Sequence, residues 1–121
     1  MKHILYILIL LGFTSVANAG VGDVYYCQSS KIVMIKEGSV EEFSAQQFNF
    51  KRNEKELVFG KGGYFSETIK PLTHSIDEWF RGNDELSGGY IDYRDGKFGY
   101  ASYNFVEDRT LVIMASCDTF E

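Results

Sequence analysis

The chain of 121 residues has 17 acidic and 12 basic side chains, and its formal net charge is −5 at pH 7. This length is enough for one domain built around one hydrophobic core. The acidic balance argues against nucleic acid and anionic membrane surfaces as partners, because both bind basic protein faces.

Residues 1–19 have the pattern of a signal peptide. A short basic start precedes the apolar run Ile4–Phe13, and Ala17–Ala19 supplies small residues at the cleavage position. The run is shorter than the roughly 20 residues that span a bilayer, and Gly20 rather than a cysteine follows the cleavage site. We therefore expect residues 20–121 to form a single secreted or periplasmic β-domain without a membrane anchor. An N-terminal core helix is the alternative interpretation of the apolar run.

The two cysteines, Cys27 and Cys117, lie near opposite ends of this domain, each in a β-rich segment. An exported chain meets oxidising conditions, and two cysteines allow a single intramolecular pairing. Together with His74, the one histidine after residue 19, they cannot fill a tetrahedral zinc site. We predict a Cys27–Cys117 disulfide and no metal or cofactor.

The first strands are expected at residues 23–29 and 31–36. Glu37-Gly38 then forms a two-residue turn into Ser39–Phe43, with positive φ at Gly38. The pattern predicts a tight hairpin.

A second hairpin is expected between Gln47–Lys51, whose two phenylalanines share a face, and Leu57–Phe59. Gly60–Gly63 reads as a flexible joint. Strand-like composition resumes at Tyr64–Ile69 and ends before Pro71.

The clearest local signal is Asp95-Gly96 between the alternating runs Tyr90–Arg94 and Lys97–Ala101. Asp-Gly in this position is a strong hairpin signal. The register predicts one aromatic face, which consists of Ile91, Tyr93, Phe98 and Tyr100.

Residues 75–81 are ambiguous. Ser75 and Glu78 have the spacing of a capping box and predict a short helical turn, while a strand through Glu78–Arg81 is nearly as well supported. Thr110–Ala115 is apolar on both faces and indicates a central or barrel-closing strand. The expected fold is all-β: an antiparallel meander of about seven or eight strands, closed or partly closed into a small barrel, with a sandwich as the alternative.

No residue pattern indicates catalysis. His74, Ser75 and Asp77 resemble a triad only superficially, because residues this close in sequence do not easily adopt triad geometry. The run Asp92–Gly96 lacks the spacing of a calcium loop. We expect a protein that is not an enzyme, with a small hydrolase as the rival interpretation.

Aromatic residues make up 16% of the chain, and most of them are expected in the core. A minority could line a ligand pocket or a binding face. Binding of an unknown protein partner or small ligand is the expected function, and a subunit with an exposed strand edge is a further possibility. The residues assigned to the candidate binding surface are Tyr64, Trp79, Phe80, Tyr90 and Tyr103.

Five short segments carry a resemblance: Val24–Cys27, Phe48–Arg52, Leu57–Gly60, Gly96–Tyr100 and Cys117–Phe120. In these segments the chain resembles a class of small exported proteins of unknown function from bacterial and phage-like genomes. The resemblance covers most of the domain and implies no activity. More distantly, Tyr25–Cys27 and the late Cys117 are similar to periplasmic inhibitors of c-type lysozyme. That similarity implies a compact β-barrel with disulfide-linked terminal strands, and lysozyme as a partner.

Overall fold

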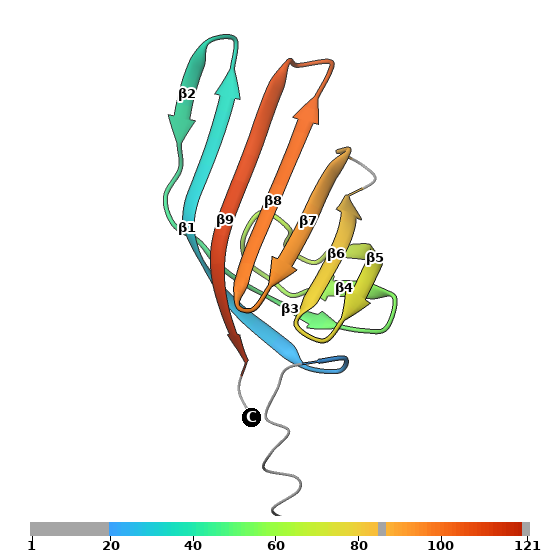
Figure 1. Cartoon of the computed structure of the whole chain (residues 1–121). Helices are drawn as coiled ribbons and strands as arrows, with labels where there is room; N and C mark the ends of the chain where they lie inside the picture. Colours follow the sequence, from blue (N-terminus) through green and yellow to red (C-terminus); the bar gives the residue numbers. More distant parts are fainter. Residues whose placement is uncertain (1–19, 85–86, 120–121) are drawn as a thin grey trace, which may run out of the picture.

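The computed structural model describes residues 20–84 and 87–119, which form nine β-strands (Figure 1). The described residues contain no helix, and so none that could cross a membrane. The predicted signal peptide, residues 1–19, lies outside the described residues. The strands are β1 (Val24–Lys36), β2 (Ser39–Glu42), β3 (Gln47–Arg52), β4 (Glu56–Phe59), β5 (Ile69–Ile76), β6 (Trp79–Asp84), β7 (Gly89–Arg94), β8 (Lys97–Asn104) and β9 (Arg109–Thr119).

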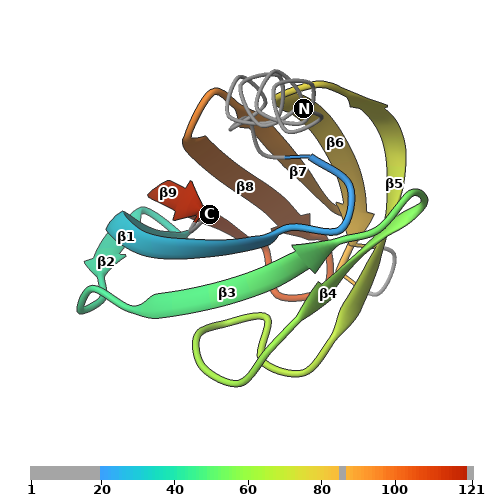
Figure 2. The same cartoon turned by 90° about the horizontal axis from the view of Figure 1, so that it is seen from below.

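Eight of these strands form a closed antiparallel barrel. From β3 to β9 each strand pairs with the next in sequence, and β1 pairs with both β3 and β9 to complete the ring (Figure 2). The short strand β2 is additional and pairs with the second half of β1. The predicted all-β meander and its closure into a barrel are confirmed, and the sandwich alternative is wrong.

Strand β1 is long enough to pair with two different strands along one of its edges. Its first half pairs with β3 and its second half with β2, while β9 runs beside almost its whole length. The register with β9 shifts between Ser29 and Lys31, and such a bulge bends a strand. Strand β8 likewise continues to Asn104, beyond its last pairing with β7 at Ala101. Residues 33–42 and 102–110 therefore project past the rest of the barrel (Figure 1); we call them the extension.

Aromatic side chains fill the barrel. Alternation along each strand sends every second residue inward; β3 and β8 each contribute two buried rings, and β1, β4, β6 and β7 contribute one each. The ring of Tyr25 stacks on Phe50 with centroids 5.0 Å apart, and Phe80 stacks on Tyr93 at 4.4 Å. A small gap remains in the core beside Ile32, Phe48 and Phe65. It has no room for a water molecule. The buried aromatic residues are Tyr25, Phe48, Phe50, Phe59, Phe65, Phe80, Tyr93, Phe98 and Tyr100.

The predicted hairpins are confirmed, including their turns. Glu37 and Gly38 have φ values of 45° and 84°, and Asp95 and Gly96 have 47° and 89°. Positive φ at both central residues is the type I′ pattern, whose twist matches that of the flanking strands. In the β7–β8 hairpin the predicted register is also correct: Tyr93 lies opposite Phe98 and Ile91 opposite Tyr100.

Of the two interpretations of residues 75–81, the strand is confirmed from Trp79 onward and the helical turn is wrong, because this segment is the β5–β6 hairpin with Asp77 and Glu78 in its turn. The Ser75 hydroxyl does not cap a helix; it accepts a hydrogen bond of 2.9 Å from Arg52 Nη2 on β3. The side chains that follow alternate as in a strand, with Trp79 outward and Phe80 in the core.

The predicted strand at Tyr64–Ile69 is also misplaced. Residues 61–67 form a loop that turns the Phe65 side chain into the core, where its ring lies 4.7 Å from that of Phe59. Strand β5 begins only at Ile69 and continues through Pro71, which lies opposite Glu56 on β4.

The predicted disulfide is confirmed and closes the barrel. Cys27 on β1 and Cys117 on β9 are direct cross-strand partners with Cα atoms 4.0 Å apart. The Cys117 N–H points away from β1 and donates to the Gly96 carbonyl at 2.8 Å. The cysteines therefore occupy a non-hydrogen-bonded pair, the position in which antiparallel side chains are closest.

Candidate functional site

The five aromatic residues assigned to a binding surface do not form one site. Phe80 has an exposed fraction of 0% and belongs to the core, so its assignment to a surface is wrong. Tyr64 lies in the β4–β5 loop, with its ring centroid 5.7 Å from that of the core residue Tyr100. Trp79 and Tyr90 lie on the outer wall of β6 and β7, and Tyr103 lies on the extension.

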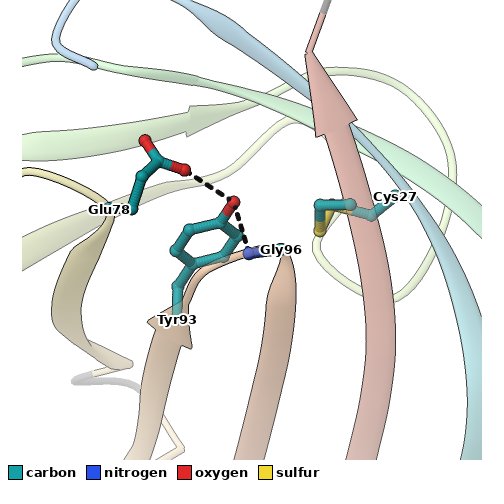
Figure 3. Close-up of a disulfide and its surroundings, with 5 residues drawn as sticks. Cys27, Glu78, Tyr93 and Gly96 are labelled. Atoms are coloured by element: carbon teal, nitrogen blue, oxygen red, sulfur yellow. Dashed lines mark hydrogen bonds between the residues drawn. A yellow bond between two sulfur atoms is a disulfide. The ribbon is translucent and has the colours of Figure 1, made fainter. Parts of the chain in front are cut away.

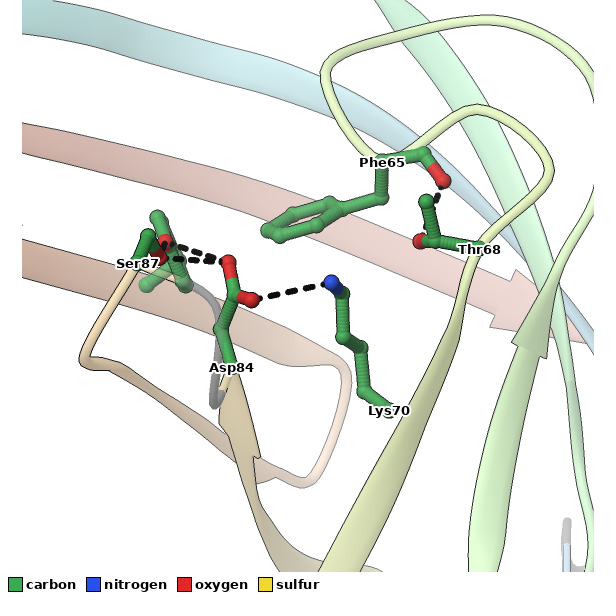
Figure 4. Close-up of polar contacts among 6 residues, drawn as sticks. Phe65, Thr68, Lys70, Asp84 and Ser87 are labelled. Carbon is green, nitrogen blue, oxygen red and sulfur yellow. Dashed lines mark hydrogen bonds and ion pairs between the residues drawn. The ribbon is translucent and has the colours of Figure 1, made fainter.

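One end of the barrel is closed by a buried ion pair. Lys70 Nζ lies 2.9 Å from Asp84 Oδ1, and the second carboxylate oxygen accepts hydrogen bonds from Ser87 and Tyr100 at 2.6 and 2.8 Å (Figure 4). Burial alone would raise the pKa of Asp84, but hydrogen bonds from Ser87, Lys70 and Tyr100 outweigh it and lower this pKa. The pair is satisfied within the protein.

The opposite end is closed by Arg52, whose exposed fraction is 2%. Its guanidinium donates to the Tyr25 hydroxyl, the Ser75 hydroxyl and the Asp77 carbonyl, and lies 4.6 Å from the centroid of a core ring. The Glu78 carboxylate accepts hydrogen bonds from the hydroxyls of Tyr25 and Tyr93. Figure 3 shows the bond from Tyr93.

The pKa values of the buried tyrosines at these two ends are raised above the ordinary tyrosine value. Burial, followed by the charge of Glu78, raises the pKa of Tyr93. Burial also raises the pKa of Tyr100, and its hydrogen bond to Asp84 adds to this effect. Protein side chains therefore occupy both ends of the barrel and the core between them.

The triad-like cluster does not assemble. The His74 ring packs on the outer wall against Trp79, with centroids 4.2 Å apart, whereas the Ser75 hydroxyl faces inward to Arg52. A nucleophile and a base on opposite faces of a strand cannot exchange a proton. Among residues 20–84 and 87–119, no three side chains of the metal-binding types gather at one point.

A polar hollow of about 480 Å³ lies on the outer wall of β5, β6 and β7. The strand register creates it: Arg81 lies opposite Asp92, and Asn83 opposite Tyr90. Thr73 joins them at the bulge in β5. Tyr90 was among the predicted binding residues, whereas the polar side chains beside it were missed, because their proximity depends on cross-strand pairing.

The extension carries a second candidate surface. Phe105 and Val106, in the β8–β9 turn, have exposed fractions of 80% and 94%. Tyr103 on β8 and the β1–β2 hairpin residues Ile35 and Val40 are exposed as well. The sequence indicates this surface through two consecutive apolar residues, Phe105 and Val106, in a turn between two strands. Neither residue was assigned to the predicted binding surface.

Comparisons of the chain with protein-family models, with curated proteins and with solved structures give no match.

Proposed function

We propose that the protein is a binding module that holds a basic protein partner on the extension. The exposed apolar side chains on the two projecting hairpins, above all Phe105 and Val106, carry this proposal. Contiguous exposed apolar side chains of this kind mark interaction surfaces. The same side chains on an isolated domain would be a liability for solubility, so a partner that covers them gives them a role.

Aromatic residues in a hairpin turn that is held by local contacts are suited to act as anchors. The rings of Tyr103 and Phe105 pack edge to face with centroids 5.6 Å apart, and the Tyr103 hydroxyl donates to Asp108 at 2.8 Å. Interface energy concentrates in a few such aromatic anchors. The β8–β9 turn is further held by the Asn104 side chain, which accepts a hydrogen bond from the Glu107 N–H at 3.0 Å.

The charge of the extension favours a basic partner. Two of its acidic residues are neutralised, since Lys31 lies 2.8 Å from Glu42 and Arg109 lies 3.0 Å from Glu107. Three more acidic residues, Glu37, Glu41 and Asp108, form no ion pair with any described residue, against one basic residue of the extension in the same state, Lys36. Complementary charge around an apolar contact raises association rates and selects the partner.

A second copy of the chain is a poorer occupant. Strand β2 pairs only with β1, so its other edge is open to a further strand. Two copies joined at this edge would place Glu41 and Glu42 of one β2 against the same acidic strand of the other. Like charges on neighbouring strands are destabilising. The negative charges on this edge therefore disfavour pairing with a second copy of β2 and leave the edge available to a basic strand.

Hen egg-white lysozyme is the first probe, because it is a basic c-type lysozyme and matches the distant sequence resemblance; cytochrome c is a second basic protein. Biolayer interferometry should show binding to at least one of them, weakened by added salt. The double variant Phe105→Ser/Val106→Ser should lose at least tenfold in affinity. Tyr90→Ser, which removes another largely exposed ring outside the extension, should bind like the wild type.

Two results would overturn the proposal. One is an absence of binding to both basic proteins. The other is co-sedimentation of the wild type with phosphatidylcholine vesicles that the Phe105→Ser/Val106→Ser variant loses, which would assign the tip to lipid. Circular dichroism and the unfolding midpoint should show that the variants keep the fold, since Phe105 and Val106 are too exposed to support the core.

A further inference from the structure

We propose that the polar hollow on the outer wall of β5, β6 and β7 binds a neutral carbohydrate, with a sugar ring stacked on Tyr90. This site lies on the barrel wall, outside the extension, and does not rest on the protein partner proposed above. Its side chains belong to three paired strands, so the barrel itself fixes their spacing.

The hollow has the dimensions of a small-molecule site. Its volume of about 480 Å³ falls within the roughly 300–1,000 Å³ typical of such sites. Thr73, Arg81, Asn83, Tyr90 and Asp92 supply its side chains, and the backbone of Gly82 forms part of its lining. A monosaccharide or a disaccharide is of the corresponding size.

Tyr90 supplies an apolar platform. Its exposed fraction is 70%, although it stands in the middle of a sheet, between Asn83 on β6 and Ala101 on β8. The small side chain of Ala101 leaves one side of the ring uncovered. A pyranose presents a face of C–H groups that matches an aromatic ring, while its hydroxyls remain at the edge.

The polar side chains around this ring suit hydroxyl groups. The Asn83 amide both donates and accepts, Asp92 accepts, and Arg81 donates through several N–H groups. A sugar hydroxyl also donates and accepts, so it can bridge such a mixed set. A ligand with acceptors alone, such as phosphate, would leave Asp92 opposed to it.

The charges in the hollow cancel. Arg81 Nε lies 3.6 Å from Asp92 Oδ1, and each side chain remains more than half exposed. The pair therefore holds its two charges side by side while both groups stay accessible to a ligand. A hollow with no net charge favours an uncharged polar ligand over an anion or a cation.

The wall beneath the hollow is rigid. A methyl group at Gly82 would meet the Pro71 carbonyl oxygen at 3.0 Å, so β5 and β6 approach closely there. Next to the hollow, Trp79 is held between His74, with ring centroids 4.2 Å apart, and the Arg94 guanidinium, 4.3 Å from its ring centroid. A pre-formed site loses less conformational freedom when it binds.

A glycan microarray with neutral and sulfated glycans tests the class of ligand, and isothermal titration with cellobiose, maltose, lactose and chitobiose tests the site. The wild type should bind at least one neutral glycan. Tyr90→Ala should weaken that binding at least tenfold and Asn83→Ala at least fivefold. The matched control Tyr103→Ala removes an exposed tyrosine from the neighbouring strand and should leave binding unchanged.

Several outcomes would overturn this proposal. They are an array on which no neutral glycan binds, a preference for sulfated over neutral glycans, and equal losses in Tyr90→Ala and Tyr103→Ala. The Phe105→Ser/Val106→Ser variant separates the two proposals, because it should lose the protein partner and keep the sugar. Circular dichroism of every variant excludes unfolding as the cause of lost binding.

Discussion

Lys70 and Asp84 form an ion pair inside the barrel, with Nζ and Oδ1 2.9 Å apart and both side chains less than one-tenth exposed. The pair is stable because Ser87 and Tyr100 also donate to the Asp84 carboxylate. A buried ion pair gains little over an apolar pair of similar volume, but the loss of one partner leaves an uncompensated charge.

Lys70→Met should therefore lower the free energy of unfolding by about 3–5 kcal/mol, as measured by urea denaturation. The double variant Lys70→Met/Asp84→Leu should recover part of this loss, because it removes both charges. Lys31→Met, which breaks the exposed pair with Glu42, should cost less than about 1 kcal/mol. Equal costs at the two lysines would contradict the burial of the Lys70 pair.

The carboxylate of Asp84 should make the free energy of unfolding depend on pH in the acidic range. Since the pKa of Asp84 is lower in the folded than in the unfolded protein, its contribution is fully present above the unfolded pKa of about 3.9. It is lost as the pH falls through the lower folded pKa. The free energy of unfolding should fall less steeply below pH ~4 in Asp84→Asn than in the wild type. Parallel curves for the two proteins would show that another group dominates.

Tyr93 and Tyr100 should make the free energy of unfolding depend on pH in the alkaline range, where it should fall as the pH rises. Their pKa values are raised in the folded state, so the stability they contribute is complete below the unfolded pKa of about 10. It is lost as the pH rises above that value. In an absorbance titration of tyrosinate, Tyr93 and Tyr100 should ionise only above the ordinary tyrosine pKa of about 10, or on unfolding. Ionisation of every tyrosine together near pH ~10, with the fold intact, would contradict their burial.

Two glycines of the β7–β8 hairpin should differ in their tolerance of a side chain. Gly96 has a φ of +89°, so Gly96→Val should cost about 1 kcal/mol or more. Gly99 lies in β8 without positive φ, and an added methyl group would meet its nearest neighbour, the Asp92 carbonyl, at 3.8 Å. Gly99→Ala should therefore be neutral or slightly stabilising. Thermal denaturation of the two variants measures the difference, and equal midpoints would place the turn elsewhere.

Sequence patterns predicted those parts of the fold that depend on neighbouring residues. Asp95-Gly96 specifies its own turn, and the alternation in β3 places Phe48 and Phe50 inward. That same alternation places Arg52 inward, although a basic residue in a strand is usually solvated. Its burial depends on the Ser75 hydroxyl and the Asp77 carbonyl, which come from another hairpin.

The errors have the same origin in long-range contacts. Ser75 fits a capping box locally, and its hydrogen bond to Arg52 became apparent only with β3 and β5 in place. The extension exists because β1 and β8 continue beyond their pairings with β3 and β7, and no turn residue in the sequence marks where those pairings end. The hollow beside Tyr90 requires the register of three strands, so its polar residues could not be grouped from their positions in the sequence.

The Cys27–Cys117 bond spans the seam at which β1 and β9 close the ring, and it links positions 90 residues apart. A tensile load applied between residues 20 and 119 would therefore pass through this covalent link and bypass the hydrogen bonds of the strands between the two cysteines. Only the short segments outside the bridge could peel away before the bond is reduced. A load applied at the extension would instead act along β1 and β9 in shear. The disulfide thus resists a load applied between residues 20 and 119, whereas only backbone pairing resists a load applied at the extension.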